Sequence, residues 1–149
     1  RAAGSEGMIG GQVLDLEAED QTLEHQALEQ LHCLKTGALF KASLRAGAIL
    51  SGMEPAGLEM LDQFAHYFGL AFQITDDILD VTGDEQLIGK PVGSDAKNLK
   101  TTYTTLFGIE GAQAMAEECV AACLESLAGF GPEADFLRGL ASYTLHRTA

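Results

Sequence analysis

The stretch that decides the fold is Phe72-Gln73-Ile74-Thr75-Asp76-Asp77-Ile78-Leu79-Asp80. Its polar residues are spaced three, one and three apart, and residues three and four apart share one face of a helix. The flanking residues, from Phe68 to Val81, are mostly apolar. The stretch therefore predicts an apolar helix with a single polar stripe, formed by Gln73, Asp76, Asp77 and Asp80.

Two interpretations of this stripe differ in what neutralises its charge. A solvated helix face normally mixes Lys with Glu, but this stripe holds no cation. Its aspartates crowd the last helical turn, where the macrodipole is already negative and each costs roughly 0.3–1 kcal/mol. A divalent cation removes the difficulty, because Asp76 and Asp80 lie one turn apart and can both bind one ion. Since magnesium accepts one or two carboxylates together with water and phosphate, we expect Mg²⁺, with Mn²⁺ as the alternative ion.

The rest of the chain is also helical in pattern, since no long segment alternates apolar and polar residues with a period of two. Gly and Pro residues mark the breaks between elements. We expect helices over residues 6–19, 23–34, 36–50, 57–80, 101–107, 111–128 and 133–147, with a loop over residues 81–98. At 149 residues and 46% hydrophobic residues, the chain can form one all-α bundle or one piece of a larger one.

Composition and charge exclude several classes of function. The formal net charge is −13, and nucleic-acid binding depends on Lys and Arg, so no nucleic-acid partner is expected. The same charge repels small anionic substrates unless a cation bridges them. No apolar run reaches the ~20 residues of a membrane span, and the N-terminus has no signal-peptide pattern. The chain lacks an initiator Met, so we expect its natural start to lie further upstream.

Three cysteines, Cys33, Cys119 and Cys123, form no disulfide framework. Cys119 and Cys123 lie one helical turn apart, but no second Cys/His pair completes a tetrahedral zinc site. We therefore interpret the three as small buried hydrophobic residues of a cytoplasmic protein.

Further polar residues suggest a second part of the site. In the first expected helix Gln12, Asp15 and Glu19 share a face, although an ordinary amphipathic helix is the better explanation for this segment by itself. Lys35 stands at the junction of the second and third expected helices. Lys90 and Lys100 flank the loop expected over residues 81–98, which is rich in glycine. Each by itself is explained by plain surface exposure, but together they can pair with diphosphate oxygens.

Four motifs in order resemble the trans-polyprenyl diphosphate synthases, the family of farnesyl and geranylgeranyl diphosphate synthases. Residues 72–80 are similar to the family's second aspartate-rich motif, and residues 10–15 (GGQVLD) resemble the helical turn before it. Lys35-Thr36-Gly37 resembles a lysine–threonine pair of the family. The stretch after the aspartates is matched by Gly89-Lys90, Asp95 and Lys100-Thr101-Thr102-Tyr103. The resemblance covers nearly the whole chain, and the four motifs together are much more specific than any one alone.

The resemblance implies an isoprenoid synthase helical bundle around a deep cavity, and three sets of site residues. The magnesium ligands would be Asp76, Asp77 and Asp80. The catalytic residues would be Lys35, Thr36, Gln73, Lys90 and Lys100. The substrate-binding residues would be Gln12, Asp15, Lys35, Thr36, Phe72, Gln73, Lys90 and Lys100. The implied enzyme is a homodimer that condenses isopentenyl diphosphate with dimethylallyl or geranyl diphosphate to give farnesyl diphosphate, or geranylgeranyl or longer products as the alternative.

The family's first aspartate-rich motif has no counterpart here, and would lie upstream of residue 1. We therefore expect residues 1–149 to be the C-terminal portion of a single domain, left by truncation or proteolysis and inactive alone. One rival is a non-catalytic subunit of a heteromeric synthase. The intact aspartate motif and its lysines argue against this rival, because a subunit without chemistry does not need them. A class I terpene cyclase usually lacks the strings at residues 35–37 and 100–103. A generic helical metal-binding module does not explain four ordered motifs.

Overall fold

The computed structural model describes residues 1–83 and 100–147. Its elements, in order, are α1 (Met8–Glu17), α2 (His25–His32), the π-helix η1 (Cys33–Gly37), α3 (Ala38–Leu50), α4 (Pro55–Thr82), α7 (Tyr103–Ser126), the 3₁₀-helix η2 (Pro132–Ala134) and α8 (Asp135–Thr144). These ranges contain no strand, so the expected all-α class is confirmed. No helix in them is both long enough and apolar enough to cross a bilayer.

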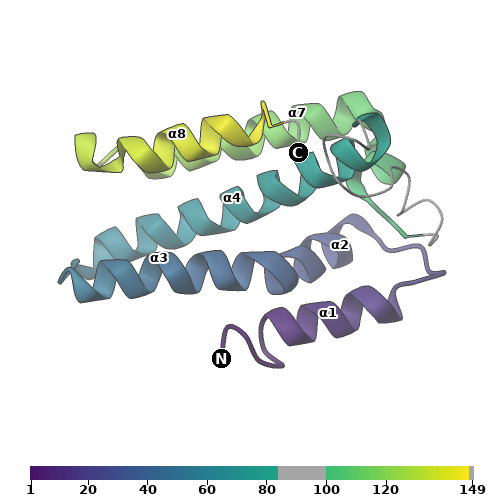
Figure 1. The fold of residues 1–149 in the computed structure, drawn as a ribbon, viewed down its shortest axis with the longest axis horizontal. Coiled ribbons are helices and arrows are strands. Elements are labelled where there is room, and N and C mark those ends of the chain that lie inside the picture. The colour runs from purple at the N-terminus through teal and green to yellow at the C-terminus, as the bar shows by residue number, and fades with distance from the viewer. Residues whose placement is uncertain (84–99, 148–149) are drawn as a thin grey trace.

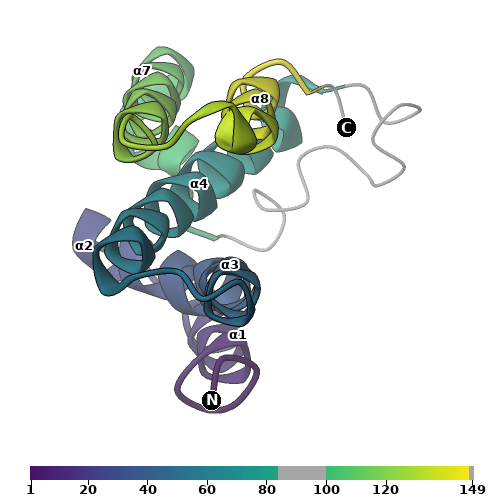
Figure 2. The same ribbon diagram turned by 90° about the vertical axis from the view of Figure 1, so that its left-hand side faces the viewer.

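Helix α4 lies in the middle of the molecule (Figure 1). Helices α7 and α8 pack along one side of it, and α2, η1 and α3 along the other. The end-on view places α1 outermost, beyond α3 and away from α7 and α8 (Figure 2). Helix α4 begins at Pro55, a residue favoured in the first turn of a helix, and continues to Thr82. The whole aspartate stretch therefore lies on its C-terminal half.

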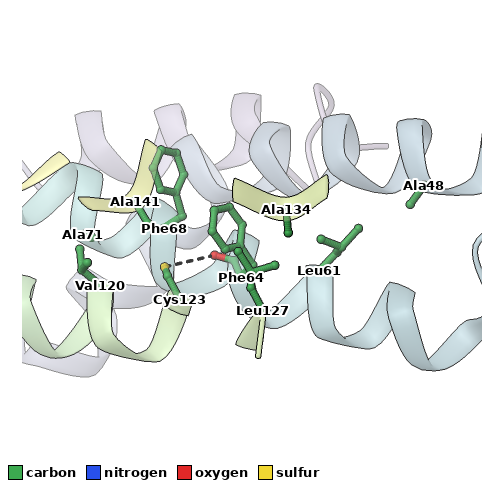
Figure 3. Close-up of a cluster of buried hydrophobic side chains, with 10 residues drawn as sticks. All are labelled: Ala48, Leu61, Phe64, Phe68, Ala71, Val120, Cys123, Leu127, Ala134 and Ala141. Carbon is green, nitrogen blue, oxygen red and sulfur yellow. Dashed lines mark hydrogen bonds between the residues drawn. The ribbon is translucent and has the colours of Figure 1, made fainter. Parts of the chain in front are cut away.

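The main hydrophobic core lies between α4, α7 and α8 (Figure 3). Phe64 and Phe68 of α4 stack with ring centroids 5.6 Å apart, and Cys123 of α7 is fully buried beside them. A second cluster, nearer the aspartates, contains Ile74 of α4 and Tyr103 of α7. Both clusters hold α4 against α7, and Ala48 of α3 and Leu28 of α2 extend them to the other helices.

One expected helix boundary is wrong. The helices predicted over residues 23–34 and 36–50 form one continuous rod, because η1 joins α2 to α3 without a break. The break predicted between residues 107 and 111 is present, because α7 consists of two helical segments that meet at Gly108, whose φ of 72° and ψ of 172° are non-helical. Glycine adopts such a φ without the clash that a Cβ would cause.

Two glycines allow backbones to approach closely near the aspartate helix. A Cβ at Gly11 of α1 would lie 2.5 Å from the Cα of Lys35 in η1. A Cβ at Gly69 of α4 would lie 3.1 Å from the Cα of Gly37. The π-helix is therefore held between α1 and α4 by contacts that leave little room for a side chain.

Candidate active site

The predicted site residues of α1 and η1 meet at the carboxylate of Asp15. The Nζ atoms of Lys35 and Lys100 donate to the same oxygen, Asp15 Oδ2, at 2.9 and 2.8 Å. Lys100 also lies 3.8 Å from Glu19. Burial raises the pKa of Asp15, but the hydrogen bonds from Lys100 and Lys35 outweigh burial, so its pKa is lowered from the ordinary value. Asp15 is therefore an ionised carboxylate that gathers two lysines from distant parts of the chain.

The next residue of η1 faces α4. Thr36 Oγ1 donates to Gln73 Oε1 at 2.8 Å. Because Lys35 and Thr36 are consecutive, the turn directs one side chain to α1 and the other to α4. Phe72, the neighbour of Gln73, is partly buried, and its ring packs edge-on against Phe40 at a centroid distance of 5.7 Å. The structure thus brings Asp15, Lys35, Lys100, Thr36 and Gln73 together around η1.

The three aspartates of the expected stripe do not lie in one environment. The Asp76 side chain is 36% exposed, and its Oδ1 lies 3.5 Å from Nη2 of Arg147. Asp77 is 5% exposed, and its Oδ2 accepts a hydrogen bond from the backbone N–H of Tyr103 at 2.8 Å. Asp80 is 2% exposed. Because consecutive residues are about 100° apart around a helix, Asp77 reaches the start of α7, and the single stripe divides.

Arg147, near the C-terminus, contacts α4 beside the aspartate stretch. Its guanidinium lies 4.2 Å from the centroid of the Phe72 ring and donates to the Phe72 carbonyl at 2.9 Å. The contact with Asp76 thus places a cation beside the first aspartate of the motif. The negative carboxylate attracts positive charge to this position. Sequence analysis did not assign this residue to the site.

Asp76 and Asp80, the two expected ligands of the ion, are one helical turn apart on α4. The Asp76 side chain is 36% exposed, which leaves room for an ion that keeps waters and phosphate oxygens as its other ligands, whereas Asp80 is almost fully buried. Lys90 lies outside the described residues. Gln12 is exposed on α1, three residues before Asp15.

His32, the last residue of α2, was missed by sequence analysis. It is 7% exposed, its ring stacks on Tyr103 at 5.8 Å, and neither ring nitrogen has a hydrogen-bond partner among the described residues. Burial, together with the nearby charge of Lys35, lowers the pKa of His32 to about 4. The sequence does hold a pattern that could have pointed to His32. It lies three residues before Lys35 on a helical segment, and residues so spaced share a helix face.

We expect His32 to make stability fall as the pH is lowered. Its pKa is about 4 in the folded state and about 6.5 in the unfolded state. The unfolded chain therefore binds the extra proton between these values, and about 2 kcal/mol of unfolding free energy is lost between pH 7.5 and pH 5. Urea unfolding at both pH values measures this loss.

His32→Phe keeps an aromatic ring against Tyr103 and removes the titrating group. The variant is expected to lose about 2 kcal/mol less than wild type over the same pH interval, because all the other titratable groups are the same in both proteins. An identical loss in both would contradict the assignment.

Asp15→Asn is expected to lower the unfolding free energy by about 2 kcal/mol, because it removes the carboxylate charge that two mostly buried ammonium groups share. Asp62 supplies a matched control, since its Oδ2 also accepts from two cations, Lys41 at 3.1 Å and Arg45 at 2.7 Å. Those cations are more exposed, 51% and 39% against 30% and 19% for Lys35 and Lys100. Asp62→Asn should therefore cost less than about 1 kcal/mol. Chemical denaturation of both variants compares them, and equal losses would refute a special role for Asp15.

The chain is similar in sequence to one family of known proteins. A family model described as polyprenyl synthetase matches residues 3–129. The chain is 50% identical over 113 residues to a farnesyl diphosphate synthase of Geobacillus stearothermophilus, covering 76% of this chain and 38% of the relative. It is 42% identical over 150 residues to a farnesyl diphosphate synthase of Escherichia coli, covering 98% and 50%.

Among solved structures, the fold is similar to a geranyltransferase from Helicobacter pylori complexed with magnesium and isoprenyl diphosphate. The TM-score is 0.78 at 33% identity, over 96% of this chain and 48% of that one. The expected isoprenoid synthase fold is thereby confirmed. The chain spans half or less of the length of these relatives.

Proposed function

Because this chain belongs to the polyprenyl synthetase family, we propose that it is the C-terminal half of a prenyltransferase. The proposed reaction joins isopentenyl diphosphate to dimethylallyl or geranyl diphosphate and yields farnesyl diphosphate. The observation that carries the proposal is the Asp15–Lys35–Lys100 cluster, which adjoins the Thr36–Gln73 pair through consecutive residues of η1. Cations held beside hydroxyl and amide oxygens suit a substrate with a diphosphate at one end and a reacting carbon nearby.

In this proposal the lysines bind the allylic diphosphate. Asp15 holds Lys35 and Lys100 in place before substrate arrives, so little reorganisation is needed when negative charge develops on the leaving diphosphate. Asp76 and Asp80 would hold Mg²⁺, and bound magnesium would neutralise part of the same charge. Thr36 and Gln73 would lie near the reacting carbons and steady the allylic cation that forms when the carbon–oxygen bond breaks and diphosphate leaves. Isopentenyl diphosphate then attacks this cation, and loss of a proton completes the new product.

The apolar face of α1 supports the proposal that a further part of the enzyme packs here. Ile9, Val13 and Leu16 are 51%, 47% and 57% exposed. Exposed apolar side chains on one helix are typical of an interface. We propose that the N-terminal half of the domain covers such surface and that the complete enzyme is a homodimer. The 149-residue chain alone is then inactive.

The test is condensation of geranyl or dimethylallyl diphosphate with radiolabelled isopentenyl diphosphate by the full-length protein. We expect product with Mg²⁺, none with excess EDTA, and none from the 149-residue chain alone. Chromatography of the dephosphorylated product distinguishes farnesol from the longer geranylgeraniol. Release of diphosphate without consumption of isopentenyl diphosphate would indicate a cyclase instead. No turnover of either substrate would favour the non-catalytic subunit.

A further inference from the structure

A second group of metal-binding side chains lies on α2, η1 and α4, and the proposed reaction does not use it. Glu29 of α2, Cys33 of η1 and His66 of α4 each offer a ligand atom, and these atoms lie within 4.8 Å of one another. We propose that Glu29, Cys33 and His66 bind one zinc ion, with water in the fourth position.

The distances agree with tetrahedral zinc. The Cys33 Sγ and His66 Nδ1 atoms are 3.5 Å apart. Bonds of about 2.3 Å from zinc to sulfur and about 2.0 Å to nitrogen, at a tetrahedral angle, place the two ligand atoms about 3.5 Å apart. The pair can therefore accept the ion between them without separating α2 from α4.

Glu29 completes the set by a side-chain movement. It lies four residues before Cys33, on the same face of the rod, and its Oε1 is now 3.7 Å from His66 Nε2. Because the Glu29 and His66 side chains are 36% and 42% exposed, both have room to turn towards a common ion. Thiolate, imidazole and carboxylate are the ligands that zinc takes, and three protein ligands leave one position open.

The surroundings admit a cation from solvent. An open hollow of about 620 Å³ reaches His66 of the group and is also lined by Tyr67 and Asp62, among others. The net charge of −13 also attracts cations to the protein surface. A zinc ion here would tie α2 to α4 where η1 begins, two residues before Lys35.

Cobalt is the probe, because a cysteine thiolate bound to Co²⁺ gives a charge-transfer absorption that oxygen ligands do not. The full-length protein, stripped of metal by chelation, is titrated with Co²⁺ and then with Zn²⁺. We expect one Co²⁺ per chain with the thiolate band, displaced by Zn²⁺, and a thermal unfolding midpoint that rises with Zn²⁺. Absence of the band in wild type would overturn the proposal.

Variants identify the ligands. Cys33→Ser should lose the band, and His66→Gln should bind Co²⁺ at least tenfold more weakly, whereas Cys119→Ser, a partly buried thiol on α7, should behave as wild type. A band that persists in Cys33→Ser refutes the site. If circular dichroism shows that Cys33→Ser has lost its helices, Glu29→Gln decides, because the Glu29 side chain is only partly buried and glutamine keeps its shape. Its affinity should fall about tenfold, and an unchanged affinity would exclude the three-ligand site. These readouts are independent of prenyl transfer.

Discussion

Replacing Asp76 by Ala is expected to lower the condensation rate of the full-length enzyme by roughly 10²–10³-fold, the effect of removing one group that stabilises developing charge. Asp76 is the open carboxylate of the aspartate stretch, with a 36% exposed side chain that a cation already approaches, since Arg147 lies 3.5 Å away. Removing it takes away a ligand of the proposed magnesium ion, so the Mg²⁺ concentration for half-maximal rate should rise as well. Steady-state turnover at several Mg²⁺ concentrations measures both effects.

The control for this prediction is Glu59→Ala, which removes an exposed carboxylate near the other end of the same helix. Its rate and Mg²⁺ dependence should match wild type. Asp77→Ala makes a second comparison, because Asp77 accepts a hydrogen bond from the N–H of Tyr103 and should affect stability as well as rate. If Asp76→Ala retains more than a fifth of the wild-type rate with an unchanged Mg²⁺ requirement, the assignment of Asp76 is wrong.

Gly11→Ala is expected to lower the unfolding free energy by at least about 3 kcal/mol, the upper end of the cost of overpacking. The added Cβ would lie 2.5 Å from Lys35 Cα and 2.8 Å from the carbonyl carbon of Leu34. Backbone atoms cannot turn aside as a flexible side chain can, so α1 must move away from η1. Such a shift also pulls Asp15 from Lys35, and urea unfolding of the variant measures the combined loss.

Gly47→Ala is the matched control, since Gly47 is also inside a helix but a Cβ there meets nothing within 4 Å. Alanine is the better helix former by about 1 kcal/mol, so this variant should be more stable than wild type. Opposite signs for the two glycine-to-alanine changes are the expected result. A loss of less than 1 kcal/mol at Gly11 would show that α1 is not fixed against η1.

Much of the site could be predicted because its chemistry conflicts with local helix preferences. Three aspartates in the last turns of an apolar helix stand out in sequence, and α4 does carry them there. Sequence analysis predicted that Lys35 and Lys100 share a diphosphate site, but it did not predict that both bind Asp15. Which carboxylate holds them depends on how α1 packs against η1, and helix periodicity carries no information on packing partners.

Other features depend on tertiary contacts. Sequence analysis set Cys33 aside as a buried small residue, because its partner His66 is 33 residues away on another helix. It placed Asp77 in the stripe with Asp76, since spacing alone does not reveal that the start of α7 lies against one side of α4. The expected break at residue 35 is absent because the π-turn η1 carries the rod through residues 33–37, where Gly37 packs closely on Gly69 of α4.

The π-helix η1 holds one residue more than the α-helical turn it replaces. Because the extra residue is contained in that one turn, α2 and α3 keep the rotation about the rod that an uninterrupted α-helix would give them. Deleting one residue from η1 should therefore restore a regular α-helix and leave the core contacts of Leu28 in place. Within the turn, Lys35 and Thr36 would no longer reach Asp15 of α1 and Gln73 of α4 as they do now. A single deletion in this segment should thus harm the site more than the fold.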